Sequence, residues 1–158
     1  MLLLCSFIIA GVAETVEGPK SCKLCNMDRT RFTHSRMLIV YGDDTRVGVC
    51  SLHCAAEELY LNRARQVRSL MVADYYSLKL IDARTASWVV GGRKPGVMTG
   101  LAKWAFDRPE DARRFIKENE GALNSYDLTM DSATREVMDQ LAEEKAAERE
   151  IQREQVSE

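Results

Sequence analysis

The stretch SCKLCNMDRTRFTH, residues 21–34, places two cysteines, a methionine and a histidine close together. Its cysteines, Cys22 and Cys25, form a C-x2-C pair, and Cys50 and Cys54 form a C-x3-C pair later in the chain. Each short pair can direct two sulfurs at one centre, so this spacing is typical of metal ligands. The same pairs can also close as two local disulfides in an exported protein. The spacing therefore favours one metal site built from two segments, with disulfides as the alternative.

Short strands and one helix are predicted between and after the two cysteine pairs. Residues 36–41 (RMLIVY) and 45–50 (TRVGVC) are typical of strands, and a Gly-Asp-Asp turn joins them. A helix is expected over residues 51–66, with Ser51 as its N-cap and with acidic residues early and basic residues late. The C-x3-C pair then lies at the helix start, one turn apart on one face. This order predicts a treble-clef-like unit, in which a knuckle and a helix start meet over one ion.

The second half of the chain repeats this pattern without cysteines. Strands are predicted over residues 67–77 and 86–92 and at the end of 96–106, and a helix over 108–122 with Asp107 as its N-cap. The economical interpretation is two small β-β-α units of about 50 residues each. The sequence therefore predicts an α+β fold class.

The remaining segments lie at the two ends of the chain. From residue 129 onward the sequence is charged, lacks Gly and Pro, and is rich in helix formers. Its apolar positions are sparse, so we expect a solvated helix, with a partner-binding helix as the alternative. The predicted division is a signal-like leader over 1–19, a cysteine-rich metal-binding unit over 20–66, a second α+β unit over 67–128 and a charged C-terminal helix over 129–158.

An apolar run from Leu2 to Val12 opens the chain. It is long enough for the core of a signal peptide and too short to span a membrane, and small residues at 11–13 resemble a cleavage site. No Lys or Arg precedes the run, which departs from the usual signal peptide. We expect export to the periplasm or the cell surface, with a lipid on Cys5 as an alternative route to membrane association.

Composition and motif context limit the classes of function that the chain can have. The chain of 158 residues has a net charge of −2 and 46% hydrophobic residues, which is typical of a folded protein and gives no reason to expect a nucleic-acid partner. A redox C-x-x-C pair lies at the start of a helix, where the helix dipole lowers the thiol pKa. Here the first pair lies in a polar loop, so a thiol oxidoreductase is the weakest hypothesis. No group of residues suggests substrate turnover, and we expect no enzymatic activity.

Two metals compete for the predicted site. Four thiolates suit a structural zinc site that stabilises a small fold. Met27 favours Cu(I), because a thioether is a poor ligand for zinc and a soft thiolate and thioether pair selects Cu(I). Met27 also stands in a polar loop with no apolar stripe to join. His34 and His53 lie beside the ligand segments, and a histidine in such a place is more often structural than metal-bound.

The segment CKLCNM (22–27), together with IDAR and WVVGGRKPGVM in the second half, resembles the nitrous oxide reductase accessory protein family, NosL. The similarity covers about residues 20–122. It implies an exported copper-binding chaperone with two small related α+β units. It also implies a copper site at Cys25 and Met27, with Met98 as a further candidate sulfur.

The segment CSLHC departs from the family pattern, in which a single cysteine is more usual at this place. Cys25, Cys50 and Cys54 then form a candidate three-thiolate site, with Cys22 or Met27 as a fourth neighbour. The predicted function is to carry Cu(I) to a client such as nitrous oxide reductase by thiolate and thioether ligand exchange. A structural zinc-binding interaction module is the alternative.

Overall fold

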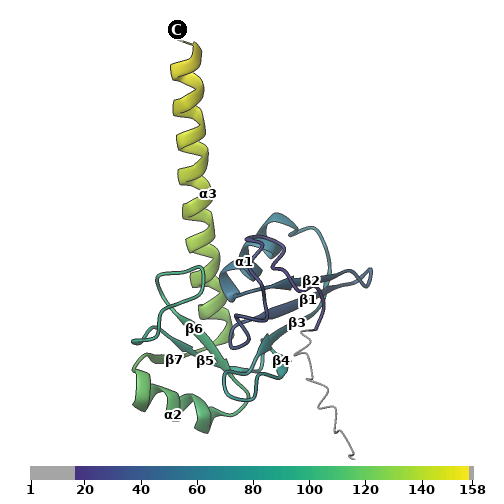
Figure 1. The fold of residues 1–158 in the computed structure, drawn as a ribbon, viewed down its shortest axis with the longest axis vertical. Helices are drawn as coiled ribbons and strands as arrows, with labels where there is room; N and C mark the ends of the chain where they lie inside the picture. Colours follow the sequence, from purple (N-terminus) through teal and green to yellow (C-terminus); the bar gives the residue numbers. More distant parts are fainter. Residues whose placement is uncertain (1–16, 157–158) are drawn as a thin grey trace, which may run out of the picture.

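The computed structural model describes residues 17–156. The predictions for Cys5 and for most of the leader concern residues 1–16, which lie outside the described part. Within residues 17–156, no helix is both long and apolar enough to cross a bilayer. This part of the chain forms two sheets and three helices, one of them long and projecting from the rest (Figure 1). The predicted α+β class and C-terminal helix are therefore confirmed.

The first sheet contains the hairpin predicted to follow the first cysteine pair. Its strands are antiparallel and have the order β2-β1-β3-β4. Their bounds are β1 Met37–Tyr41, β2 Arg46–Val49, β3 Val67–Ala73 and β4 Leu80–Asp82. Helix α1, Leu52–Leu61, directly follows β2, which confirms the predicted strand, strand and helix order. All side chains of β1 are buried, as expected for a central strand with an unbroken apolar sequence.

Strand β3 lies in a different place from the one predicted. The sequence pattern put it in the second unit, but it pairs along β1, with Leu70 opposite Ile39. Strand β4 then extends the same sheet from β3. Pairing between strands that are far apart in the sequence is not visible in a local pattern, so the sequence did not indicate that β3 pairs with β1. The division of the chain into domains stays a prediction.

The second sheet has three antiparallel strands in the order β6-β5-β7. Their bounds are β5 Ser87–Val90, β6 Lys103–Phe106 and β7 Ala122–Asn124, and α2, Pro109–Asn119, packs on this sheet. Arg108, and not the predicted Asp107, occupies the N-cap position of α2. The backbone N–H of Asp107 donates to the Asp74 carboxylate at 2.9 Å, outside the helix, whose first residue is Pro109.

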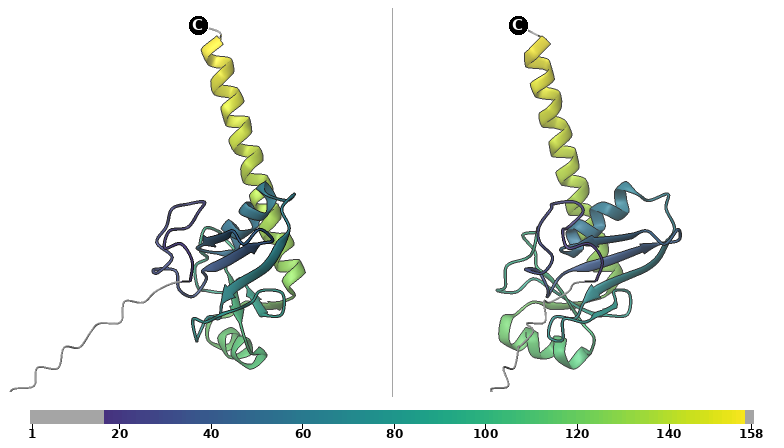
Figure 2. Two further views of the ribbon diagram at one scale, coloured as in Figure 1. Left: turned by 90° about the vertical axis from the view of Figure 1, so that its right-hand side faces the viewer. Right: turned by 45° about the vertical axis from the view of Figure 1, so that its right-hand side comes forward.

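Helix α3, Tyr126–Val156, is the longest element, with 31 residues. Its first half packs on α1 and β5, and Ala133 and Val137 are fully buried there. From Ala142 to residue 155 every described side chain is exposed, and this half projects beyond the two sheets (Figures 1 and 2). The predicted solvated helix is therefore correct only for the second half, and the first half belongs to the core.

A buried arginine joins the segment of the first cysteine pair to the first sheet. The side chain of Arg29 is completely buried, and burial lowers its pKa from the ordinary value. Its guanidinium donates to the backbone carbonyls of Val49 at 3.2 Å and Met37 at 2.9 Å, in strands β2 and β1. It also donates to the carbonyls of Glu17 and Pro19 before the cysteine pair. One side chain thus fixes two strands and an irregular segment relative to one another.

Gly48 leaves the space that the Arg29 guanidinium occupies, because a Cβ at position 48 would lie 2.6 Å from Nη1. We therefore predict that Gly48→Ala lowers the free energy of unfolding by about 2 kcal/mol, as overpacking of a rigid site does. Gly100→Ala is the matched control, since a Cβ there meets nothing within 4 Å. Urea unfolding of both variants checks this, and equal stability losses would contradict the packing of Arg29 against Gly48.

Candidate metal centre

The first cysteine pair lies in a tight backbone loop over residues 20–29, which we call the knuckle. The Cys22 N–H donates to the carbonyl of Met27 at 2.8 Å, and the Asn26 N–H donates back to the carbonyl of Cys22 at 3.0 Å. Asn26 has a positive φ of 59°, a conformation that asparagine tolerates better than most residues. The loop closes on itself, so both sulfurs of the pair are held on one small unit.

The knuckle is also attached to the strand that precedes the second cysteine pair. The Lys23 N–H donates to the carbonyl of Gly48 at 3.0 Å, next to the point where the Arg29 guanidinium packs. Cys50 follows β2, and Cys54 lies in the first turn of α1, as the sequence predicts. Ser51 occupies the predicted N-cap position, although its side chain makes no capping hydrogen bond.

The two pairs meet in one cluster of four sulfurs, those of Cys22, Cys25, Cys50 and Cys54, all within 4.8 Å of one another. The Sγ of Cys25 is 3.5 Å from that of Cys50 and 3.9 Å from that of Cys54, and the last two are 3.7 Å apart. A tetrahedral ion with metal–sulfur bonds near 2.3 Å has sulfurs roughly 3.8 Å apart. All four residues are free thiols. Their arrangement therefore fits a single soft metal ion.

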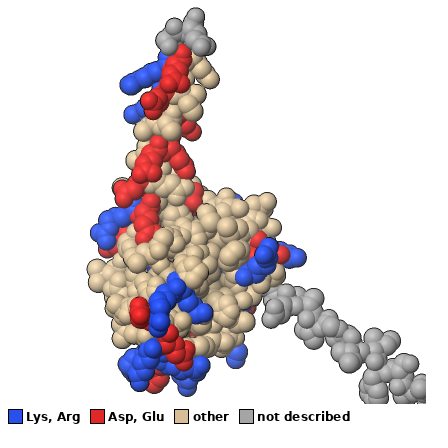
Figure 3. Space-filling view, turned by 60° about the vertical axis from the view of Figure 1, so that its left-hand side comes forward, with Lys and Arg blue, Asp and Glu red and all other residues tan. Residues whose placement is uncertain are grey.

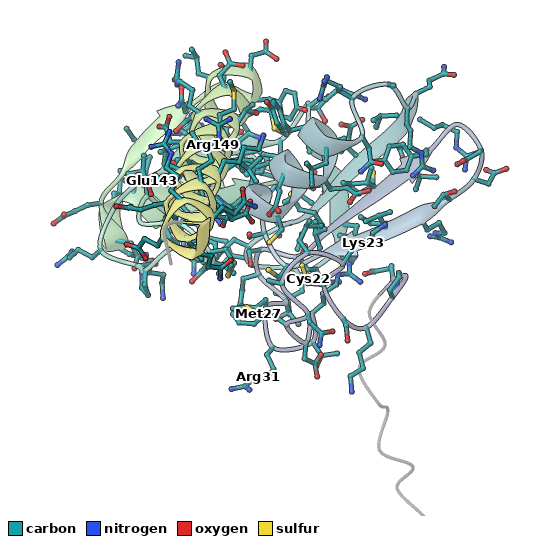
Figure 4. The ribbon with its side chains drawn as sticks, turned by 90° about the horizontal axis from the view of Figure 1, so that it is seen from above. Cys22, Lys23, Met27, Arg31, Glu143 and Arg149 are labelled. Carbon is teal, nitrogen blue, oxygen red and sulfur yellow. The ribbon has the colours of Figure 1, made fainter. Side chains whose placement is uncertain are left out.

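The cluster is closed on the inside and partly open on one side. Cys22, Cys50 and Cys54 are at most 2% exposed, whereas Cys25 is only half-buried. Figure 4 shows Cys22 and Met27 on the knuckle, with Met27 on the side that faces α3. An incoming ligand therefore reaches the cluster most directly at Cys25.

Hydrogen bonds within the cluster shift the pKa values of the thiols in different directions. The pKa of Cys22 lies well below its ordinary value, because its sulfur accepts hydrogen bonds from the thiols of Cys50 and Cys54 and from the backbone N–H groups of Cys25 and Leu24. The same hydrogen bond with Cys22, together with burial, raises the pKa of Cys50 to about 12. Hydrogen bonds of Cys54 with Cys22 and with Cys50, together with burial, raise the pKa of Cys54. The hydrogen bonds within the reduced cluster therefore favour a thiolate at Cys22 over one at Cys50 or Cys54.

The buried Arg29 cation contributes to this electrostatic balance. Its charge interacts favourably with Cys22 and Cys50. A positive charge beside thiolates lowers the cost of collecting several of them in one place. Sequence reasoning missed Arg29, because nothing in a polar loop distinguishes a buried arginine from an exposed one.

The other two candidate ligands are the thioether sulfurs of Met27 and Met98. Met27 is half-buried and packs against the core that contains the thiols, and its role as a ligand stays a prediction. Met98 is 39% exposed in the loop between β5 and β6, with a positive φ of 60°. The treble-clef description of the unit also stays a prediction.

The two histidines lie outside the thiol cluster. The Nδ1 of His34 donates to the carbonyl of Tyr75 at 2.7 Å, which ties this exposed side chain to the end of β3. His53 is buried on α1, with its Nδ1 3.9 Å from the Glu136 carboxylate of α3. Glu136 also binds the Lys103 ammonium at 2.7 Å, so these groups join α1, α3 and β6.

The chain is similar to a known family and to a known structure. A family model described as NosL matches residues 13–133. A solved structure of the copper chaperone NosL from Shewanella denitrificans is similar to this chain, with a TM-score of 0.57 and 25% sequence identity. The similarity covers 73% of this chain and 92% of that one. No curated protein matches the chain.

Metal binding at this cluster should release protons, since the raised pKa values of Cys50 and Cys54 keep both thiols protonated near neutral pH. A metal ion must displace these protons, so its apparent affinity rises with pH, by about tenfold per pH unit for each proton displaced. Competition with a chelator from about pH 6 to about pH 8, corrected for the chelator's own protonation, checks this. An affinity independent of pH would contradict the assignment.

Proposed function

The chain belongs to the NosL family, and from this premise we propose that it binds Cu(I) and carries it to a copper-accepting protein. The observation that supports this proposal most strongly is the cluster of four cysteine sulfurs, in which Cys25 alone is partly exposed to solvent. Soft thiolates select Cu(I) over harder ions. The similar structure from Shewanella denitrificans is described as a copper chaperone, which supports the same cargo here.

The proposed roles of the cysteines follow from their burial. Cys22, Cys50 and Cys54 hold the ion from the inside, and Cys25 is the ligand that an incoming sulfur replaces. The incoming sulfur forms its bond to Cu(I), the bond from Cys25 breaks, and the Cys25 thiolate takes up a proton from solvent. The bonds from Cys22, Cys50 and Cys54 then break in turn as further sulfurs of the partner bind, and the released thiolates are protonated in the same way. Cu(I) keeps its oxidation state, so no electron donor is needed. Met27, on the same loop, is the proposed neutral ligand that stabilises the ion during exchange.

The client and the compartment are further parts of the proposal. Nitrous oxide reductase is the client that the family name suggests, and a carrier without enzymatic activity fits a site built only of metal ligands. The apolar run at residues 2–12 supports export to the periplasm or the cell surface. The same N-terminal run supports an association with the membrane.

A structural zinc site is the second candidate, and one observation favours it. Three of the sulfur separations, 3.5, 3.7 and 3.9 Å, lie close to the edge of a tetrahedral four-thiolate zinc site, which is roughly 3.8 Å. Such a site would join the knuckle to α1 and stabilise the fold. The half-exposed Cys25 favours Cu(I) instead, because a structural site is normally closed.

Titration of the reduced protein with Cu(I) and with zinc, each against a chelator, tests the proposed cargo. We expect Cu(I) to displace bound zinc. Met27→Leu should weaken Cu(I) binding about tenfold, equal to about 1.4 kcal/mol, and leave zinc binding nearly unchanged.

Met138→Leu is the matched control, because Met138 is 46% exposed on α3 and should affect neither metal. Zinc that stays bound in the presence of excess Cu(I), with no copper uptake, would contradict the carrier function and support the structural site. An equal loss of affinity for both metals in Met27→Leu would contradict the role of Met27 as a copper ligand.

A further inference from the structure

Basic residues are concentrated in the segment of the chain that contains the first cysteine pair. Residues 18–36, which include the knuckle, contain five basic residues and one acidic residue. The whole chain, in contrast, has a net charge of −2. The segment that presents Cys25 to solvent is therefore much more basic than the rest of the protein.

Two of these cations are exposed and have no carboxylate partner. Arg29 and Arg36 are buried, and Lys20 lies 3.6 Å from Asp28. Lys23 and Arg31 are exposed and make no ion pair within residues 17–156. The arginines in and just before α2 differ in this respect. Each of them forms an ion pair with a carboxylate three or four residues away, namely Arg108, Arg113 and Arg114.

Lys23 and Arg31 lie on opposite sides of the metal-binding loop. Figure 4 shows Lys23 on one side of Cys22 and Arg31 beyond Met27 on the other. Met27 lies between them in this view, and Leu24, Cys25 and Met27 of the same loop are only partly buried. A small apolar centre with charged residues at its rim is the usual composition of a protein docking surface.

The neighbouring helices carry charge of the opposite sign. The exposed half of α3, residues 142–156, carries five acidic and three basic residues, and acidic side chains follow much of its length in Figure 3. Burial raises the pKa of Glu57 in α1, and repulsion from Glu144 of α3 adds to this shift. Burial is the larger cause of that shift. An acidic partner is therefore attracted to the knuckle and repelled from α3, which restricts where it can dock.

We propose that the surface formed by Lys23, Leu24 and Met27 of the knuckle and by Arg31 just after it docks an acidic, sulfur-bearing segment of the copper-accepting partner. This inference rests on the proposed copper-carrying function. The acidic groups of the partner contact Lys23 and Arg31, and this contact brings the partner's sulfur ligand to Cys25. Long-range attraction of this kind increases association rates by roughly 10-fold to 1,000-fold at low ionic strength.

Transfer of Cu(I) to two synthetic peptides tests the proposal. Both peptides contain the same Met-x-x-Met core, which is flanked by aspartates in one and by lysines in the other. The loaded full chain is mixed with each peptide at about 0.01 M salt, where the screening length is about 30 Å. We expect transfer to the aspartate peptide to be at least about tenfold faster, and the difference to disappear near 1 M salt.

The double variant Lys23→Gln, Arg31→Gln should lose the preference for the aspartate peptide. Arg84→Gln, Lys117→Gln is the matched control, because it removes two exposed cations from the second half of the chain. The Cu(I) affinity of each variant is measured in the same buffer, so that weakened loading is separated from weakened docking.

Equal transfer rates, or faster transfer to the lysine peptide, would overturn the docking proposal and leave the copper-carrying function intact. The same holds if the control variant loses the preference as fully as Lys23→Gln, Arg31→Gln does. Failure of the unmodified chain to load Cu(I) would overturn the proposed function, and the docking proposal with it.

Discussion

The buried guanidinium of Arg29 is the interaction on which the metal centre depends. It donates to carbonyls of β1, β2 and the segment before the knuckle, and each hydrogen bond to a charged group contributes about 1.5–3 kcal/mol. A buried cation without such partners would be strongly unfavourable, so the strands and the knuckle must be in place together. Their joint position brings Cys22 and Cys25 to Cys50 and Cys54. The fold itself therefore gathers the four sulfurs, and Gly48 provides the space for the cation that does it.

Binding and release of a metal make opposite demands on such a site. Burial of three sulfurs and the nearby Arg29 charge favour a tightly held soft cation. Release requires a ligand that an incoming sulfur can replace, and Cys25 is the member of the cluster that is half open. The knuckle combines both features because one short loop carries a buried cysteine and an accessible one. The exposed cations Lys23, in the knuckle, and Arg31, just after it, lie on either side of Cys22 and Met27, so the proposed docking surface includes the loop that carries Cys25.

The cluster of four cysteines was largely predictable from the sequence, because short cysteine spacings and a helix start are local features. The strand, strand and helix order around it was predictable for the same reason. The pairing of β3 with β1 was not, since it joins residues that are far apart in the chain. The three-residue strands β4 and β7 are too short to show periodicity, and the first half of α3 buries Ala133 and Thr129, which a hydrophobic pattern does not mark. Arg29 was missed because burial of a charge depends on carbonyls supplied by other segments.

X-ray absorption at the copper edge of the Cu(I)-loaded full chain measures whether these sulfurs form one Cu(I) site. We expect a Cu(I) edge and a first shell made only of sulfur. In Cys25→Ser we expect fewer sulfur neighbours, with the ion still bound by the buried cysteines. A first shell dominated by nitrogen or oxygen, or a bound zinc ion that Cu(I) fails to displace, would show that these sulfurs do not form a Cu(I) carrier site.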